Sequence, residues 1–261
     1  MSINVPESIW KKRNILYKGK FTKVLDHSIS CPCAIGQTHH HPSEDLLMVE
    51  LENIGTVPFF WDHFNLLELK YAKLFPDLWK ALDEIPREGW VRREVKNPET
   101  DQEHTISLRN LVISMIDRLT EFSVNEILEL LDMLEVHEFP EIIDGDKVIV
   151  TYDQKEKERL KAEKFNSEFK AMIKICKDLP SPYGKEIFFL WLRFEKGKGK
   201  VPVLARQLDK YQAMEKAFEY QNIGWPKVLA KAFIDYSRDV IIHPVLKEKM
   251  LNIEKQASII F

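Results

Sequence analysis

Residues 123–146 read SVNEILELLDMLEVHEFPEIIDGD, and the first half of this stretch has the pattern of a buried helix. Ser123 stands three residues before Glu126, which is the spacing of a capping box at the start of a helix. The apolar residues that follow recur at intervals of three and four and therefore share one helix face: Ile127, Leu130, Leu131 and Leu134. The pattern predicts a core helix that runs from Ser123 to His137.

The second half of the stretch, VHEFPEIIDGD at 136–146, places a histidine among several acidic side chains. If the helix continued, His137 and Glu141 would share a face, and Glu138 would lie about 100° around the axis. Carboxylates at the end of a buried helix must reach water or bind a cation, because an unpaired buried charge is costly. From these residues alone, the segment is either a solvated helix end or one wall of a metal site.

The composition favours a mostly helical fold. Glycine is scarce, at 9 of 261 residues, whereas 44% of the residues are apolar. Sheet-rich folds usually need more glycine for tight turns. A second apolar run with helical spacing follows His104: Leu108, Leu111, Val112, Met115, Ile116 and Leu119. This run predicts another buried helix beside the first.

The remaining segments predict further helices and one irregular region. Residues 1–57 show no sustained period and are expected to be irregular or partly stranded. Pro76 should divide the apolar pattern of Phe60–Ile85 into two short helices. The loop GKGK at 197–200 lies between two of the later helices. Those helices are expected at about 153–177, 183–195 and 202–221, with one or two more between Pro226 and Lys255.

Charge and cysteine content exclude several classes of protein. The 38 basic and 41 acidic residues are interspersed and give a net charge of −3, which argues against a nucleic acid polymer as partner. Three cysteines do not form a disulfide framework, so a reducing cytoplasm is expected. No apolar run reaches about 18 residues and the N-terminus lacks the apolar core of a signal peptide, so no membrane span is expected.

Three separated blocks resemble one known family in order and approximate spacing. They are IPREGWVRREVKNPETDQEHT at 85–105, VHEFPEIIDGD at 136–146 and LARQLDKYQAMEKAFEYQ at 204–221. Together they resemble the HD-domain phosphohydrolases, and within them the 5'-deoxynucleotidase subfamily. The resemblance implies an all-α fold, an HD-domain helical bundle at residues 61–255. Residues 1–60 would then form an N-terminal extension of unknown role.

The resemblance also implies a metal site. The family's ligand positions fall on four residues of this chain: His104, His137, Glu138 and Asp209. A mixed imidazole and carboxylate set suits a divalent ion such as Mn, Co, Fe, Zn or Mg. The family is named for a His-Asp pair, whereas this chain has Glu138 at the second position. One extra methylene moves the carboxylate outward by about 1.5 Å.

The same resemblance assigns a reaction and its catalytic residues. Glu141 and Asp146 match the acidic residues beside the substrate, and Arg87 matches an arginine that meets the phosphate. A metal, carboxylates and a guanidinium together suit hydrolysis of a phosphomonoester. The implied protein is a cytoplasmic hydrolase, a homodimer in this family, that converts deoxyribonucleoside 5'-monophosphates into nucleoside and phosphate.

Two alternative functions remain open on the sequence. The first is a non-catalytic HD-fold protein that senses a nucleotide or binds a partner, with the metal site weakened by Glu138. The second is an HD hydrolase that acts on another phosphorylated metabolite.

Three other features favour structural explanations. Cys31 and Cys33 of CPC and the histidines 39–41 could form a soft metal site, but their spacing matches no known zinc motif, so an exposed loop is preferred. Trp90 and Trp225 could stack on a base, although burial in the core is preferred. The alternating charges of 155–164 predict an exposed helix face with ion pairs between successive turns.

Overall fold

The computed structural model describes residues 15–17, 20–22, 24–29, 45–51, 55–60, 69–224 and 227–259. The chain divides into two compact units, Met1–Leu69 and Lys70–Phe261. The junction lies nine residues after the boundary that the sequence predicts between residues 60 and 61.

The N-terminal unit contains two antiparallel sheets. Strands β1 (Ile15–Tyr17) and β2 (Lys20–Thr22) pair with each other, and β3 (Val24–Ile29), β4 (Asp45–Leu51) and β5 (Gly55–Phe60) form a second sheet in sequence order. These strands confirm the partly stranded extension expected from the sequence. Phe60 is the last residue of β5, so the prediction that helical structure begins at this residue was wrong.

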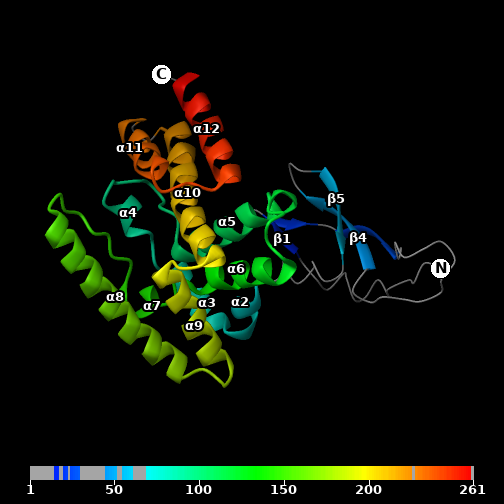
Figure 1. Ribbon diagram of the computed structural model, residues 1–261, viewed down its shortest axis with the longest axis horizontal. Coiled ribbons are helices and arrows are strands. Elements are labelled where there is room, and N and C mark those ends of the chain that lie inside the picture. The colour runs from blue at the N-terminus through cyan, green and yellow to red at the C-terminus, as the bar shows by residue number, and fades with distance from the viewer. Residues whose placement is uncertain are drawn as a thin grey trace. The chain divides into compact units, whose positions relative to one another are not determined.

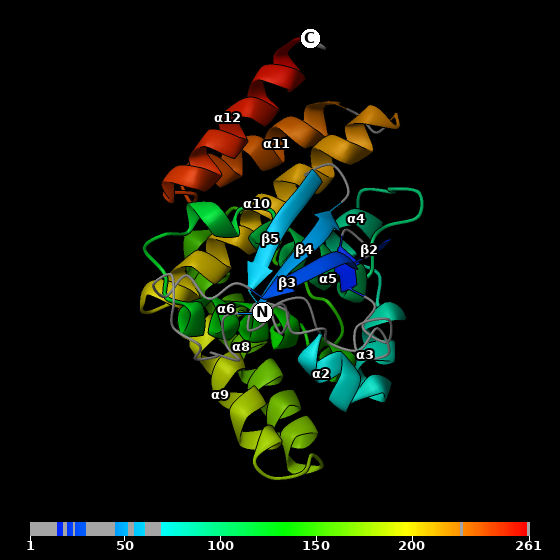
Figure 2. The same ribbon diagram turned by 90° about the vertical axis from the view of Figure 1, so that its right-hand side faces the viewer.

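The C-terminal unit is all-helical, as Figures 1 and 2 show. Its elements are α2 (Lys70–Leu74), α3 (Pro76–Asp83), α4 (Glu88–Val91), α5 (Asp101–Ile113), the 3-10 helix η3 (Ile116–Arg118), α6 (Val124–Val136), α7 (Glu141–Asp144), α8 (Gln154–Lys177), α9 (Tyr183–Lys196), α10 (Lys200–Asn222), α11 (Lys227–Arg238) and α12 (Pro244–Ile259). Most of the expected helices are confirmed to within a few residues. Of the described helices, none is both long and apolar enough to cross a membrane.

Helix α10 is the central element of the helical unit. It packs against α5, α6, α9, α11 and α12, and in Figure 1 it runs through the middle of these helices. The buried residues that make these contacts come from successive turns of α10: Leu204, Leu208, Tyr211, Met214 and Ala217. An apolar face along this helix therefore holds together segments that are far apart in the sequence.

The two helices predicted from apolar spacing are both present, and capping boxes fix where they begin. Ser123 accepts from the Glu126 amide and the Glu126 side chain accepts from the Ser123 amide, as predicted. Thr100 and Glu103 form a second capping box at the start of α5, which the sequence analysis did not single out. Because each box satisfies backbone N–H groups at a helix end, it sets the first helical residue.

Helix α5 ends earlier than its apolar pattern predicted. The pattern continues to Leu119, but α5 stops at Ile113, and the short helix η3 follows. The hydroxyl of Ser114 donates to the carbonyl oxygen of Leu111 over 2.8 Å, a local bond that competes with regular helix geometry. Met115 and Leu119 are nevertheless buried, so the pattern predicted burial correctly and helix length wrongly.

A buried carboxylate fixes the position of α2 against α6. Glu135 Oε1 accepts from the amides of Tyr71 and Ala72 at 2.6 and 2.8 Å, and Glu135 Oε2 accepts from the amide of Lys70 at 3.0 Å. Arg109 Nη1 lies 3.2 Å from the same Oε2. The first turn of α2 thus meets negative charge, which satisfies its backbone donors.

Candidate metal centre

Helix α5 supplies His104 from its first turn. The capping box at Thr100 starts the helix at Asp101, so Asp101 and His104 lie three residues apart on the same side of the turn. Both side chains are fully buried. A polar pair at this depth requires partners from other helices.

His137 and Glu138 lie where α6 ends. Helix α6 stops at Val136 and His137 is its C-cap residue, after which Pro140 precedes the short helix α7. The sequence predicted that this helix ends at His137, and the structure agrees to within one residue. Because the chain turns between His137 and Glu141, these two residues do not lie on one continuous helix. Both residues are still buried, so the turn keeps Glu141 near the cluster.

Asp209 of α10 completes a group of four side chains. One ligand atom from each of His104, His137, Glu138 and Asp209 lies within 4.8 Å of the others. His104 Nε2 is 3.3 Å from Asp209 Oδ1 and 3.5 Å from Glu138 Oε1, while His137 Nε2 is 3.2 Å from Glu138 Oε1. The structure thus brings together the four residues that the resemblance assigned to the metal.

Both imidazoles turn the same ring nitrogen toward the carboxylates. His104 Nδ1 lies 2.7 Å from Gln212 Oε1, and His137 Nδ1 lies 2.8 Å from the carbonyl oxygen of Leu134. Within the described part of the chain, neither Nε2 atom has a hydrogen-bond partner, although both are buried. Metal-binding histidines have this arrangement, with the second nitrogen held by an oxygen acceptor. Two such nitrogens and two carboxylates fit a divalent ion.

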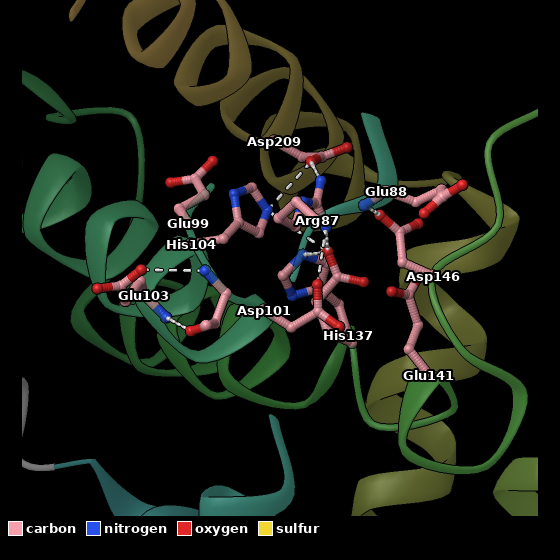
Figure 3. Close-up of polar contacts among 12 residues, drawn as sticks. Arg87, Glu88, Glu99, Asp101, Glu103, His104, His137, Glu141, Asp146 and Asp209 are labelled. Carbon is pink, nitrogen blue, oxygen red and sulfur yellow. Dashed lines mark hydrogen bonds and ion pairs between the residues drawn. The ribbon is translucent and has the colours of Figure 1, made fainter. Parts of the chain in front are cut away.

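Arg87 contacts three carboxylates of the site. Its guanidinium donates from Nη1 to Glu138 Oε1, and it lies 3.6 Å from Asp101 Oδ1 and 3.9 Å from Asp209 Oδ1. Figure 3 shows Arg87 between Asp209 and Asp101. Burial opposes the charged form, but the charges of Glu138 and nearby carboxylates raise the pKa of Arg87 well above its usual value. Arg87 is therefore a fixed cation at this site.

Two carboxylates of the cluster have pKa values well below the usual range. Although burial opposes ionisation, Arg87 and His137 hold the pKa of Glu138 well below its usual range. Lys210 and His104 do the same for the pKa of Asp209, again against the effect of burial. These two carboxylates are thus ionised, as a metal ligand must be.

A second acidic group adjoins the first. Ligand atoms of Asp101, Glu141 and Asp146 lie within 4.8 Å of one another, and Figure 3 shows Glu141 and Asp146 close together. Burial, followed by the charge of Glu138, raises the pKa of Asp101 to about 7 and the pKa of Glu141 well above its usual value. Gly145, with a φ of 71°, lies directly before Asp146, whose Oδ2 accepts from the Glu88 amide at 2.7 Å.

Two of the residues around this acidic group were not predicted. Asp101 could have been noticed from the sequence, because it is acidic and lies three residues before His104. Lys164 was assigned to the exposed face of 155–164, and that prediction was wrong for this residue. Its Nζ reaches 3.4 Å from Glu141 Oε1, 3.3 Å from Glu168 Oε1 and 3.0 Å from the Lys147 carbonyl oxygen. No local pattern indicates that this lysine points inward.

The rest of that charged face is as predicted. Arg159 lies 2.7 Å from Glu156 and also pairs with Glu163, and all three side chains are exposed. Trp90 is buried, and its ring packs on Tyr220, which confirms the preference for a core role. The predictions for Cys31, Cys33 and histidines 39–41, and for Trp225 and Pro226, fall outside the described residues.

The helical unit carries two imidazoles and two carboxylates in one cluster. This chain is therefore a helical protein with a candidate metal centre. The chain belongs to the HD domain family, whose model matches residues 80–248. The resemblance that the three sequence blocks indicated is thereby confirmed, and the all-helical unit agrees with it.

Proteins named 5'-deoxynucleotidase align with about two thirds of this chain. The 5'-deoxynucleotidase HDDC2 of Danio rerio is 31% identical over 161 residues, which are 61% of this chain and 75% of that protein. The protein of the same name from Dictyostelium discoideum is 28% identical, and the match spans 66% of this chain and 91% of that protein.

Solved structures show the same fold at lower identity. Proteins from Pyrococcus horikoshii and Pyrococcus furiosus each align with a TM-score of 0.53, at 19% and 21% identity. The alignments cover 69% of this chain and 96% and 97% of the two archaeal chains. These similarities concern the fold.

Proposed function

We propose that this protein is a metal-dependent phosphohydrolase that converts deoxyribonucleoside 5'-monophosphates into nucleoside and phosphate. The observation that carries this proposal is the convergence of two unpartnered Nε2 atoms and two ionised carboxylates beside a fixed guanidinium. The relatives named 5'-deoxynucleotidase support the substrate class.

The proposed metal ligands are His104, His137, Glu138 and Asp209, and the ion is one of Mn, Co, Fe, Zn or Mg. When bound, a divalent ion supplies Lewis acidity, which makes water a nucleophile at neutral pH and offsets charge on phosphoryl oxygens. Glu138 and Asp209 contribute two negative charges that attract the ion. The hydrogen bonds to both Nδ1 atoms hold the imidazoles in place.

We assign substrate contacts to three further residues. The Arg87 guanidinium would bind the phosphate, because a planar fork of N–H donors matches phosphate oxygens and stays charged throughout the reaction. Glu141 would orient the attacking water or the phosphate. Asp146, held by the Glu88 amide through one oxygen, keeps its other oxygen for the sugar.

The finer features of the protein are proposed on the same basis. The partner is a small phosphorylated nucleotide rather than a nucleic acid polymer, since basic and acidic residues are interspersed along the sequence and the net charge is −3. We place the protein in the cytoplasm, as a homodimer.

Phosphate release from a panel of nucleotides tests the proposal. The purified protein is stripped of metal and resupplied in turn with Mn, Co, Fe(II), Zn or Mg, and deoxy- and ribonucleoside mono- and triphosphates are offered as substrates. Metal-dependent release that is selective for deoxymonophosphates is expected. Asp209→Asn should abolish release, whereas Glu248→Gln, an acid-to-amide change at an exposed surface pair, should leave it intact.

Other results would reject the proposed substrate. Release from a different phosphorylated compound would move the protein to another hydrolase specificity. Metal binding without release from any nucleotide would instead support a sensing or partner-binding protein.

A further inference from the structure

A buried chain of hydrogen bonds lies behind His104, on the side away from the candidate metal centre. His104 Nδ1 meets Gln212 Oε1 at 2.7 Å, and Gln212 Nε2 donates to Glu99 Oε2 at 3.0 Å. The other oxygen of Glu99 accepts from Trp90 Nε1 at 2.9 Å. Figure 3 shows Glu99 on the opposite side of the His104 ring from Arg87. None of these residues is more than 3% exposed.

The direction of these bonds can be fixed from the Trp90 end. An indole N–H only donates, so Glu99 Oε1 is an acceptor, and Lys216 Nζ, 3.9 Å from Glu99 Oε2, makes the second oxygen an acceptor as well. The Gln212 amide must therefore turn its NH₂ group toward Glu99. Its oxygen then faces His104 Nδ1, because the two amide atoms point in different directions. A reversed amide would place two oxygens against each other in a buried site.

The tautomer of His104 follows from the orientation of Gln212. An amide oxygen accepts, so His104 Nδ1 must carry the hydrogen, and in the neutral ring Nε2 then keeps its lone pair. That Nε2 atom lies 3.3 Å from Asp209 Oδ1 and 3.5 Å from Glu138 Oε1, among the proposed metal ligands.

We propose that Glu99 is a positioning residue that acts through Gln212 to hold His104 as the Nδ1–H tautomer, with Nε2 ready to bind a metal ion. The inference rests on the proposed metal site and extends it to two residues that touch neither metal nor substrate. The backbone of Glu99 also contacts Arg87, since the Glu99 carbonyl oxygen accepts from the Arg87 amide at 2.9 Å. One residue thus supports both His104 and Arg87.

A single substitution should reverse the direction of both hydrogen bonds between residue 99 and His104. In Glu99→Gln, the new amide must still turn its oxygen to Trp90, so its NH₂ group faces Gln212. The Gln212 amide then reverses and presents NH₂ to His104, which must accept through Nδ1. His104 is converted to the Nε2–H tautomer, so its Nε2 atom must lose a hydrogen before it can bind a metal.

Exchanging the two side chains should restore the original tautomer. In the double variant Glu99→Gln/Gln212→Glu, the carboxylate at position 212 accepts from both the amide at position 99 and His104 Nδ1–H. The double variant contains the same two side-chain types as the wild type and has the same net charge. Recovery would therefore be due to the direction of the hydrogen bonds and not to a change in packing. Glu103→Gln is the matched control, because Glu103 is exposed in the first turn of α5, four residues after Glu99, and a glutamine retains its capping bond.

The primary measurement is NMR of the metal-stripped protein at mildly alkaline pH. Long-range ¹H–¹⁵N correlations identify which ring nitrogen carries hydrogen, and the His104→Gln variant assigns the signals. We expect Nδ1–H in the wild type, in Glu103→Gln and in the double variant, and Nε2–H in Glu99→Gln. Calorimetric titration with Mn²⁺ should show binding weaker by about 10–100-fold in Glu99→Gln, with recovery in the double variant.

Two results would overturn the inference. A hydrogen on His104 Nε2 in the wild type would do so even if no variant folds, and an unchanged tautomer in folded Glu99→Gln would do so as well. Equal Mn²⁺ affinity of the wild type and Glu99→Gln would refute the link to metal binding. Failure of the proposed substrate is separate, because it concerns phosphate release and leaves the tautomer results unchanged.

Discussion

Replacing Arg87 by methionine should separate its structural role from its role in catalysis. The guanidinium contacts Glu138 and lies 3.6 Å from Asp101 and 3.9 Å from Asp209. Methionine keeps much of the side-chain length but carries no charge. The carboxylates then lose the cation that offsets their repulsion, while a bound divalent ion could replace it.

The size of the effect follows from burial. The side chain of Arg87 is 17% exposed, and those of Glu138 and Asp101 are 8% and 0% exposed, so solvent screens these contacts poorly. Removing one partner of a buried ion pair costs about 3–5 kcal/mol. Because about 1 kcal/mol shifts the melting temperature by roughly 2–4 °C in a domain of this size, the metal-stripped variant should melt about 6–20 °C below the wild type.

Thermal melting with and without Mn²⁺ measures this prediction. Mn²⁺ should raise the melting temperature of Arg87→Met by more than that of the wild type, because the ion no longer competes with a guanidinium for the same carboxylates. Phosphate release at saturating Mn²⁺ should nevertheless fall by about 100–1000-fold, since a donor to the phosphoryl oxygens is lost. Arg118→Met is the control, because Arg118 pairs with Glu248 at the exposed surface, where solvent screens the pair, and this variant should melt close to the wild type.

Two results would contradict this reasoning. If metal-stripped Arg87→Met melts within about 1 °C of the wild type, the guanidinium does not offset buried charge. If Mn²⁺ stabilises both proteins equally, Arg87 and the metal do not share the same carboxylates.

Three further substitutions test the site and the fold. Asp209→Asn should remove both phosphate release and the rise in melting temperature caused by Mn²⁺, because a proposed ligand loses its charge. Glu138→Asp draws the carboxylate back by about 1.5 Å from its position 3.2 Å from His137 Nε2, so calorimetry should show Mn²⁺ affinity lower by at least about tenfold. Glu135→Gln turns an NH₂ group toward backbone donors or Arg109, and urea unfolding should show a loss of about 3–5 kcal/mol.

Each of these three predictions has an outcome that would contradict it. Normal turnover in Asp209→Asn would remove this residue from the mechanism. Unchanged Mn²⁺ affinity in Glu138→Asp would mean that the site adapts to the shorter side chain. A loss below about 1 kcal/mol for Glu135→Gln would show that its carboxylate does not anchor α2. Glu248→Gln serves as the common control.

Local signals in the sequence predicted the helices, and the resemblance to the HD-domain family supplied all four proposed ligands. Apolar spacing located the buried faces of α5 and α6, and the capping box at Ser123 located the start of α6. His104 and His137 were identifiable because each lies in a recognisable block. Such signals are readable because helix period and capping depend on residues within a few positions of one another.

The turn after α6 was not predictable in the same way. A continued helix would have placed His137 and Glu141 on one face, but α6 ends at Val136 and residues 137–140 form turns before α7 begins at Glu141. Both residues still reach the site, because the turn is buried against neighbouring helices. Local periodicity describes a regular helix and cannot describe how an irregular segment packs.

The sequence by itself determined a helical protein with a histidine and carboxylate constellation, whereas tertiary structure decided how those groups are held. Gln212 reaches His104 across 108 positions, and Lys164 turns inward to Glu141 from a helix whose local pattern indicates solvent. Arg87, at the start of α4, likewise contacts Glu138, which follows the end of α6. These contacts depend on how α10 packs on α5 and α6 and how α8 packs on α7 and α9. No short-range pattern specifies the direction of a side chain across a packed interface.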